Sequence, residues 1–356
     1  ALANTDTSRP GACDTATGIT GSDLAWRIQT LASDEFAGRA PSTPGGRAAS
    51  QWIADEFARM GLEPAGDTGT YFQRVPLVEA TLDTETAEFD LVVNGEPMGL
   101  EAGDDVVFWT KRLNGRQEVS GSELVFVGYG VVAPEYGWDD YAGLDMTGRT
   151  AVILVNDPGY ATRDEDLFNG NAMTYYGRWT YKYEEAMRQG ADGAIIIHQT
   201  APASYGWNVV SSSWQGAQYD LETDSANDRV PVEGWITEET ARALFEATGL
   251  DFNALTAAAS QPGFEPVPMD GAVMNAAFDT RIDRLESRNV AGVVTGTQHP
   301  DEYVLYMAHW DHLGGENGAD GSDGIYNGAV DNGTGTAAIM EIAEMMANDR
   351  PQRSVL

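Results

Sequence analysis

The feature that most constrains the fold is a short apolar run, residues 303–308, which ends at His309 and precedes a glycine-rich turn and a helical pattern. Such a run is typical of a buried strand in a parallel sheet, so we expect His309 at the carboxyl end of that strand. Ligands of open α/β sheets bind at this edge. The sequence therefore predicts an α/β protein, with a mixed, largely parallel sheet flanked by helices and a site where this strand ends.

A carboxylate follows on the glycine-rich segment 328–335, at Asp331. Apolar residues at helical spacing after Thr334 predict a helix that Thr334 or a neighbour caps, with Ile339, Ile342 and Met345 or Met346 on its buried face. Imidazole and carboxylate groups both bind zinc at roughly 2.0 to 2.2 Å, and a carboxylate can bridge two metals. Asp311 is placed to accept the free ring N–H of His309 and to fix its tautomer. We therefore predict His309 and Asp331 as metal ligands and Asp311 as a catalytic-site residue that orients His309.

Segments 308–314 and 327–335 resemble the first half of the metal site of the M28 zinc metallopeptidases. Segment 33–47 resembles the part that leads into the catalytic domain of bacterial aminopeptidases of this family, and segment 124–207 resembles the smaller α/β protease-associated (PA) domain inserted in many of them. The resemblance implies that His309 holds one zinc ion, that Asp331 bridges two, and that Asp311 orients His309. It also implies a cis peptide bond after Asp331.

The function implied by this resemblance is that of a dinuclear zinc exopeptidase, with two zinc ions, that hydrolyses N-terminal residues from peptides. The family also uses a Glu-Glu pair, a further aspartate and a further histidine, which this sequence does not contain. Residues 353–356 read as the start of the next core strand, so we expect these groups beyond it. The chain by itself is accordingly expected to be inactive, and a C-terminal fragment of the same protein is a candidate partner.

The other three histidines have ordinary structural explanations. His198 ends an apolar run that predicts a core strand, His299 lies in a turn signal before a proline, and His312 follows Asp311 and is expected to shape the loop. Segment 320–324 has the acidic and glycine content of a calcium loop but lacks the twelve-residue ligand order. We expect none of them to complete the metal site.

Three other functional readings stay open from the sequence. A carboxypeptidase acting on acidic C-termini would share the metal half-site and need basic residues such as Arg163, Arg178, Lys182 and Arg188. A non-catalytic binding protein could retain the peptidase fold. Glutaminyl cyclase activity is disfavoured by the inserted domain, and cobalt or manganese could replace zinc on similar ligands.

The charge balance limits the partners. With 55 acidic and 21 basic residues the formal net charge is −34, which argues against binding to nucleic acid or to anionic lipid. No apolar run reaches the roughly 18 residues needed to span a membrane. An exported enzyme, periplasmic or secreted with its signal peptide removed, is the expected location, and the scarcity of lysine suggests saline surroundings. The single cysteine, Cys13, excludes an intrachain disulfide and is a weak candidate for lipid attachment.

Changes in composition and apolar pattern along the chain predict four segments: a loose tail at 1–20, a first part of the peptidase domain at 21–118, the inserted domain at 119–265, and a second, truncated part at 266–356. Helices are expected near 22–31, from Pro44 to a stop at Gly61, at 183–189 and at 237–249. Strands are expected at 124–127, 150–155 and 195–197, with a hairpin at Asn94-Gly95 and a connector at 256–266.

Overall fold

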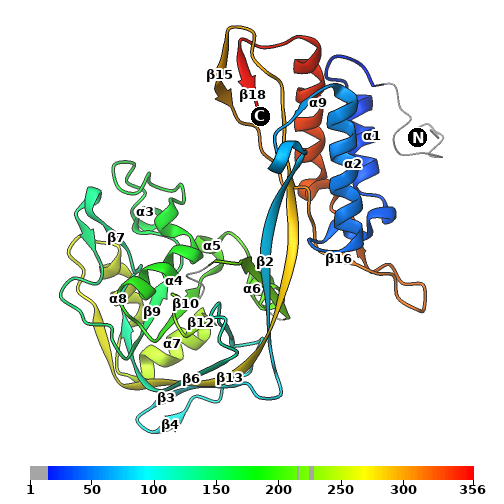
Figure 1. The fold of residues 1–356 in the computed structure, drawn as a ribbon. Coiled ribbons are helices and arrows are strands. Elements are labelled where there is room, and N and C mark those ends of the chain that lie inside the picture. Colours follow the sequence, from blue (N-terminus) through cyan, green and yellow to red (C-terminus); the bar gives the residue numbers. More distant parts are fainter. Residues whose placement is uncertain (1–14, 215, 224–227) are drawn as a thin grey trace. The chain divides into compact units, whose positions relative to one another are not determined.

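The computed structural model describes residues 15–214, 216–223 and 228–356 (Figure 1). They form two compact units, one made of the residues up to Leu77 together with Leu285–Leu356, the other of Val78–Arg284. The chain passes between the units twice, within strand β2 (Phe72–Leu82) and within strand β13 (Val267–Val290). The predicted inserted domain, 119–265, falls inside the second unit, and its identity as a PA domain stays a prediction.

Three helices form the core of the first unit, α1 (Gly21–Leu31), α2 (Pro44–Met60) and α9 (Thr334–Asn348), and they lie side by side in Figure 1. Helix α2 begins at Pro44 and ends before Gly61, whose φ of 81° is the left-handed conformation that glycine adopts most easily. Both predicted ends are therefore confirmed. The shared core consists of Leu31, Phe36, Ala49, Trp52, Ile53, Phe57, Leu62, Val294 and Met340.

The buried face of α9 differs from the predicted one. Arg27 of α1 is fully buried and bonds Glu341 at 2.7 Å as well as Glu344, both on α9. A buried guanidinium requires carboxylate partners, so these two glutamates face inward. The residues predicted to be buried, Ile339, Ile342, Met345 and Met346, are consequently only half-buried. The predicted buried face was wrong, because the helix is rotated about its own axis relative to the prediction.

The strand expected to be buried at 303–308, with His309 at its carboxyl end, is shifted and exposed: it ends at Val304, and residues 305–309 follow it as irregular chain. Strand β15 (His299–Val304) pairs in parallel with β18 (Arg353–Val355), which confirms the strand predicted at 353–356. His299 begins β15 rather than a turn, and all six residues of β15 are exposed. The predicted burial was wrong because β18 is the strand's sole neighbour within the described part of the sheet.

The second unit contains a mixed sheet with a parallel centre. Strands β6 (Arg116–Phe126), β9 (Arg149–Leu154), β10 (Gly193–His198) and β12 (Val232–Thr237) are adjacent and parallel. Strand β5 (Val106–Trp109) pairs antiparallel with β12, and β13 pairs antiparallel with β6 and with β3 (Glu88–Val93). The predicted fold class, a mixed α/β sheet flanked by helices, is confirmed.

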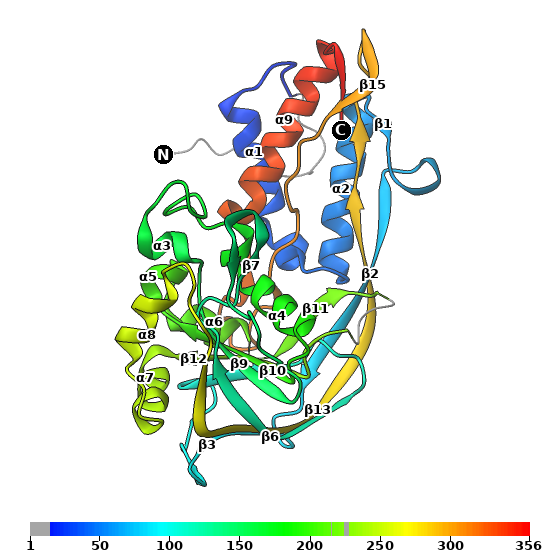
Figure 2. The same cartoon turned by 90° about the vertical axis from the view of Figure 1, so that its left-hand side faces the viewer.

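Helices cover both faces of this sheet (Figure 2). On one face α7 (Glu238–Ala247) and α8 (Phe252–Ala259) pack against Ile195 and Ile197, and on the other α4 (Trp179–Arg188) packs against Ile196. The shorter elements of the unit are β4 (Glu96–Pro97), β7 (Val132–Ala133), η3 (Pro134–Tyr136), β8 (Trp138–Asp139), α3 (Pro158–Thr162), η4 (Tyr175–Gly177), α5 (Thr200–Ala203), α6 (Trp207–Ser213) and β11 (Ala217–Leu221).

Local signals in this unit had mixed outcomes. Asn94 and Gly95, with φ of 53° and 87°, form the predicted hairpin between β3 and β4. The predicted connector at 256–266 was wrong in its first part, because α8 continues to Ala259 after Asp251 caps its first turn. Of the predicted tail, residues 1–14, including Cys13, lie outside the described residues, and Thr20 donates its main-chain N–H to Glu341.

Candidate metal site

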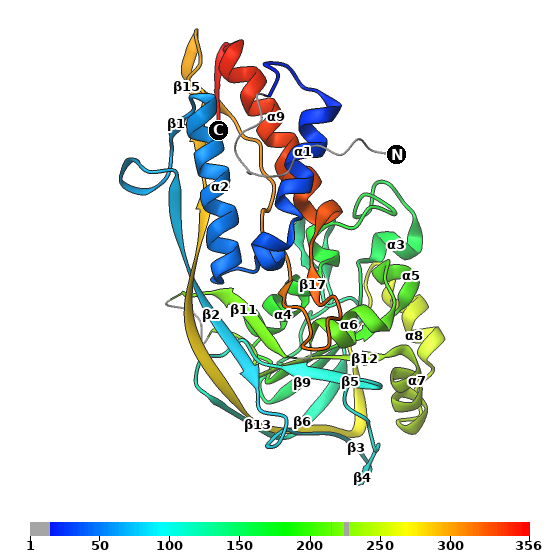
Figure 3. The ribbon, with the colours of Figure 1, turned by 90° about the vertical axis from the view of Figure 1, so that its right-hand side faces the viewer.

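The candidate site is built by a short hairpin of the first unit. Strands β16 (Gly314–Gly315) and β17 (Ile325–Tyr326) pair antiparallel, with Gly314 opposite Tyr326. The segment that enters the first strand of such a hairpin and the segment that leaves the second strand lie next to each other. His309 and Asp311 precede β16, and Asp331 follows β17 on the loop that leads into α9 (Figure 3). The hairpin therefore brings together residues that are distant in sequence.

His309 lies within contact of both of the other predicted site residues, Asp311 and Asp331. His309 Nε2 is 3.1 Å from Asp331 Oδ1, and the two side chains are 54% and 71% exposed. His309 Nδ1 is 3.1 Å from the main-chain oxygen of Asp311 and 3.5 Å from its carboxylate. The nearest group to Nδ1 is thus the carbonyl of Asp311 and not the carboxylate expected from the sequence. The roles of the three residues in metal binding stay predictions.

The spacing of His309 and Asp331 fits a shared zinc ion. Two atoms bound to one tetrahedral zinc at roughly 2.0 to 2.2 Å lie roughly 3.3 to 3.6 Å apart, and the observed 3.1 Å is within a few tenths of an ångström of that spacing. A main-chain carbonyl can only accept, so Nδ1 of His309 is the donor to Asp311, and a ring in this tautomer would present the lone pair of Nε2 to a metal. Over the described residues no group of three or more His, Cys, Asp or Glu side chains could hold a metal. The chain thus presents two ligands suited to zinc.

Helix α9 holds the two loops at its first turn. The Thr336 hydroxyl donates to the His309 carbonyl at 3.0 Å, and Asn332 Oδ1 accepts from the Gly335 N–H at 3.2 Å. Of the capping residues that the prediction allowed, Thr334 itself does not cap the helix, because its hydroxyl donates to the Val330 carbonyl. The N-cap position is the neighbouring Gly333, and the side-chain oxygen at this end of the helix comes from Asn332. The peptide bond between Asp331 and Asn332 is cis, as the resemblance implied.

The other histidines have structural surroundings. His198, in the second unit, makes a 3.0 Å hydrogen bond between Nε2 and the Tyr205 carbonyl, and burial lowers the pKa of its ring. The main-chain N–H of His312 donates to the Arg39 carbonyl at 3.3 Å. The loop residue Asp320 accepts from both the hydroxyl and the main-chain N–H of Ser322.

One residue of this region was not assigned from the sequence. Arg39 is only 1% exposed and lies between the two loops. Burial lowers the pKa of Arg39, while the charges of Asp311 and Asp331 oppose that shift. Segment 33–47 had been singled out by resemblance alone, and an arginine after Ala-Gly gives no local sign of burial. The one sequence feature that could have indicated the burial of Arg39 is the preceding glycine, Gly38, which allows the main chain to approach a neighbouring segment closely.

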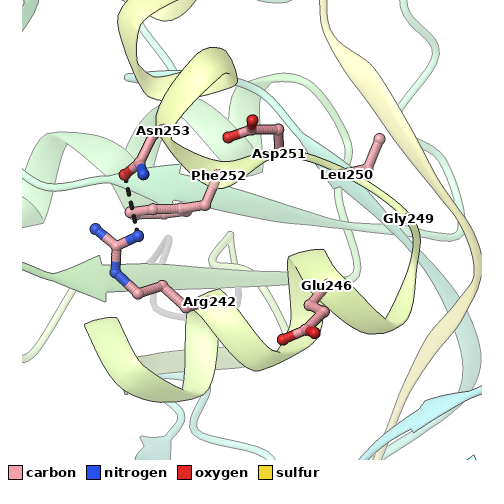
Figure 4. A pocket seen from close by; sticks show the side chains of 7 residues that line it. All are labelled: Arg242, Glu246, Gly249, Leu250, Asp251, Phe252 and Asn253. Carbon is pink, nitrogen blue, oxygen red and sulfur yellow. Dashed lines mark hydrogen bonds between the residues drawn. The ribbon is translucent and has the colours of Figure 1, made fainter.

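A shallow hollow of the second unit offers less chemistry (Figure 4). Arg242 lies over the Phe252 ring at 4.5 Å from its centroid and donates to Asn253 Oδ1 at 3.0 Å. It also pairs with Glu238. Its guanidinium is thus engaged within the protein, and we assign no function to this hollow.

Comparison with known proteins points to one family. Residues 289–356 match the peptidase family M28, and this segment contains the entire candidate site. Over 104 residues the chain is 32% identical to the aminopeptidase NAALADL1 of Mus musculus and to that of Rattus norvegicus, covering 27% of this chain. The chain spans 12% of the length of these curated relatives.

Solved structures with a similar course of the chain include an aminopeptidase from Aneurinibacillus sp. strain AM-1, at 18% identity and a TM-score of 0.45, covering 94% of this chain and 61% of that one. Another is BSAP, a zinc aminopeptidase from Bacillus subtilis, at 15% identity and a TM-score of 0.37, covering 96% of this chain and 61% of that one. Both sequence relatives are aminopeptidases by name.

Proposed function

We propose that the protein is a zinc-dependent exopeptidase of the M28 type that removes N-terminal residues from peptides, on the basis of the match of residues 289–356 to that family. The observation that carries the proposal is the 3.1 Å approach of His309 Nε2 to Asp331 Oδ1, which suits two ligands of one metal. The named relatives are aminopeptidases, which favours hydrolysis at the N-terminus of the substrate.

The residues of the site would act as follows. His309 and Asp331 would hold the metal, and the carbonyl of Asp311 keeps the ring of His309 in the tautomer that exposes Nε2. Thr336 fixes the main chain of His309 to the first turn of α9. When bound, a pair of zinc ions lowers the pKa of a water molecule toward neutrality and polarises the scissile carbonyl group. Asp331 has two carboxylate oxygens and is the candidate bridge between the two ions.

We also propose that a further polypeptide segment, a C-terminal fragment of the same protein, supplies the remaining ligands. The apolar residues that lead to the site are open to solvent, since Tyr303 is 62%, Leu305 55% and Met307 78% exposed. Parallel strands are normally covered on both faces, so this surface is suited to a covering segment. The substrate would be a peptide, and the net charge of −34 argues against nucleic acid.

The proposed location is the periplasm or the exterior of the cell. No helix among the described residues is both long and apolar enough to cross a membrane. A high density of acidic groups favours solubility in such surroundings.

The test is removal of the candidate bridging carboxylate. Asp331→Ala in the full-length protein is expected to bind fewer than two zinc ions per chain and to lose hydrolysis of amino-acid p-nitroanilides, because both metals lose a ligand. Asp301→Ala, an exposed aspartate of β15, is the matched control and should keep both. Normal zinc content with full activity in Asp331→Ala would overturn the proposal.

Two alternatives can be separated from it. A carboxypeptidase acting on acidic C-termini would hydrolyse N-acetylated acidic dipeptides in place of p-nitroanilides. Two of the four basic groups named for it are engaged elsewhere, since Lys182 is fully buried on the Tyr129 carbonyl and Arg188 pairs with Glu184 and Glu185. A non-catalytic binding protein would hydrolyse neither substrate even with its zinc bound.

A further inference from the structure

The segment that connects α1 to α2 contacts the metal-site hairpin. It is the 3-10 turn η1 (Asp34–Arg39), whose last three residues Ala37, Gly38 and Arg39 have φ of 45°, 67° and 53°. A Cβ at Gly38 would lie 2.3 Å from the carbonyl oxygen of Gly314 and 2.7 Å from that of Tyr326. A side chain at position 38 could not fit at these distances. The absence of one lets the turn touch both strands of the hairpin and places Arg39 directly after the contact.

The Arg39 side chain bonds main-chain carbonyl groups of both site loops. Nε donates to Trp310, which stands between His309 and Asp311, at 2.8 Å. Nη1 donates to Asn327 at 2.6 Å and Nη2 to Gly328 at 3.0 Å, both on the loop that leads to Asp331. Nη1 also donates to the carbonyl of Leu31 at the end of α1. One guanidinium therefore links the helix to both ligand-bearing loops.

The residue types at this point suit that linkage. A guanidinium presents five N–H donors in a rigid plane, whereas a lysine offers three donors on a single atom and cannot reach carbonyls that lie on different sides. Gly328 makes room for it, because a Cβ there would lie 2.7 Å from Arg39 Nη2. The carbonyl groups that Arg39 satisfies would otherwise lack those donors in a buried setting.

We propose that Arg39 is a positioning residue that sets the separation of His309 and Asp331 by fixing the main chain of both loops. The inference rests on the proposed metal-binding function in one respect only, namely that the two residues are ligands. It assigns Arg39 no contact with the substrate or with the metal.

A positional role and a purely electrostatic role make opposite predictions. The charge of Arg39 lies close enough to Asp311 and Asp331 to act on both carboxylates, and a nearby positive charge repels a metal cation. If Arg39 acted through charge alone, Arg39→Met would bind zinc more tightly and Arg39→Lys would match the wild type. If it acts by position, both variants bind zinc more weakly.

The first experiment measures zinc affinity in the full-length protein by competition with a chromophoric chelator. Arg39→Lys is expected to lower the affinity by about 10- to 100-fold, the usual effect of losing a group that orients metal ligands. The control is Arg47→Lys, because Arg47 is an exposed arginine of α2 that donates to the Ser42 carbonyl. The cobalt-substituted protein should show an altered visible absorption spectrum in Arg39→Lys and an unchanged one in Arg47→Lys.

A second readout does not depend on metal. In the metal-free protein, amide hydrogens of residues 327–333 should exchange faster in Arg39→Lys than in the wild type, while those of β10 exchange at the same rate. This measurement remains informative if the wild-type protein binds no zinc, a result that would defeat the proposed function and not the positional role. Wild-type zinc affinity in Arg39→Lys, or unchanged loop exchange, would overturn the inference. Should Arg39→Met fail to fold, the lysine variant alone decides.

Discussion

Strands β10 and β15 both lie in parallel ladders, yet β10 is largely apolar and enclosed, whereas β15 includes only Tyr303 and Val304 of the apolar run predicted at 303–308. Strand β10 lies between β9 and β12, and none of its six residues is exposed. Strand β15 pairs with β18 alone, and all six of its residues are exposed. The apolar run at 303–308 therefore did not specify the extent of a strand, and the burial of a parallel strand depends on which strands and helices are present on either side.

The largest expected difference is in the cost of shortening a side chain. Ile196→Ala in β10 should lower the free energy of unfolding of the second unit by about 2 to 5 kcal/mol, because it leaves a cavity between the sheet and α4. Urea denaturation followed by circular dichroism measures this. A loss under about 1 kcal/mol would mean that β10 is not packed as described.

The next effect concerns a buried acid beside β10. Burial raises the pKa of Glu233, on β12, to about 7 from its ordinary 4.5, and the side chain accepts the Trp109 indole N–H at 2.9 Å. Between these two values the folded state holds a proton that the unfolded chain has released. The free energy of unfolding should therefore fall as pH rises from 4.5 to 7, by roughly 3 kcal/mol from this group.

Glu233→Gln should remove that part of the slope while keeping the acceptor for Trp109. Asp140, whose pKa burial also raises to about 7, contributes the remainder. Glu118→Gln, on an exposed side chain of β6, is the control and should leave the slope unchanged. An unaltered slope in Glu233→Gln would show that Glu233 is ionised in the folded protein near pH 5.

The smallest effect is expected on the exposed run. Leu305→Ala should change the free energy of unfolding of this chain by no more than about 0.5 kcal/mol, because the side chain is 55% exposed. The same substitution in a full-length protein should cost several times more if a further segment covers the strand. Equal small costs in both would argue that this surface stays open and would weaken the proposed covering segment.

Signals carried by a few adjacent residues were enough to predict much of the fold. Pro44 and Gly61 marked the ends of α2, and Asn94-Gly95 marked a hairpin, because each acts through its own backbone conformation. The predicted buried face of α9 failed because Arg27, far away in sequence, draws Glu341 inward. Long-range polar contacts of this kind leave no mark in the local apolar pattern.

The residues of the candidate site likewise divide into those with a local sequence signal and those without one. His309, Asp311 and Asp331 were found because their residue types and glycine-rich context indicate a metal. The carbonyl contact of Asp311 was missed, because a main-chain group has no residue-specific signal. Arg39 was missed because its partners are carbonyl groups of loops that only the folded chain brings near it.

Because the hairpin β16–β17 closes a turn, the geometry of the site does not depend on the length of that turn. Residues between Gly315 and Gly324 are exposed, and the flanking loops are held together by the ladder pairs at Gly314–Tyr326 and Gly315–Ile325 and by the Arg39 side chain, none of which involves the turn. Lengthening a closed turn adds only a small entropic cost that grows with the logarithm of its length. The turn is accordingly a natural point of insertion, where evolution or an engineer could add an epitope or a fluorescent label without altering the distance between His309 and Asp331.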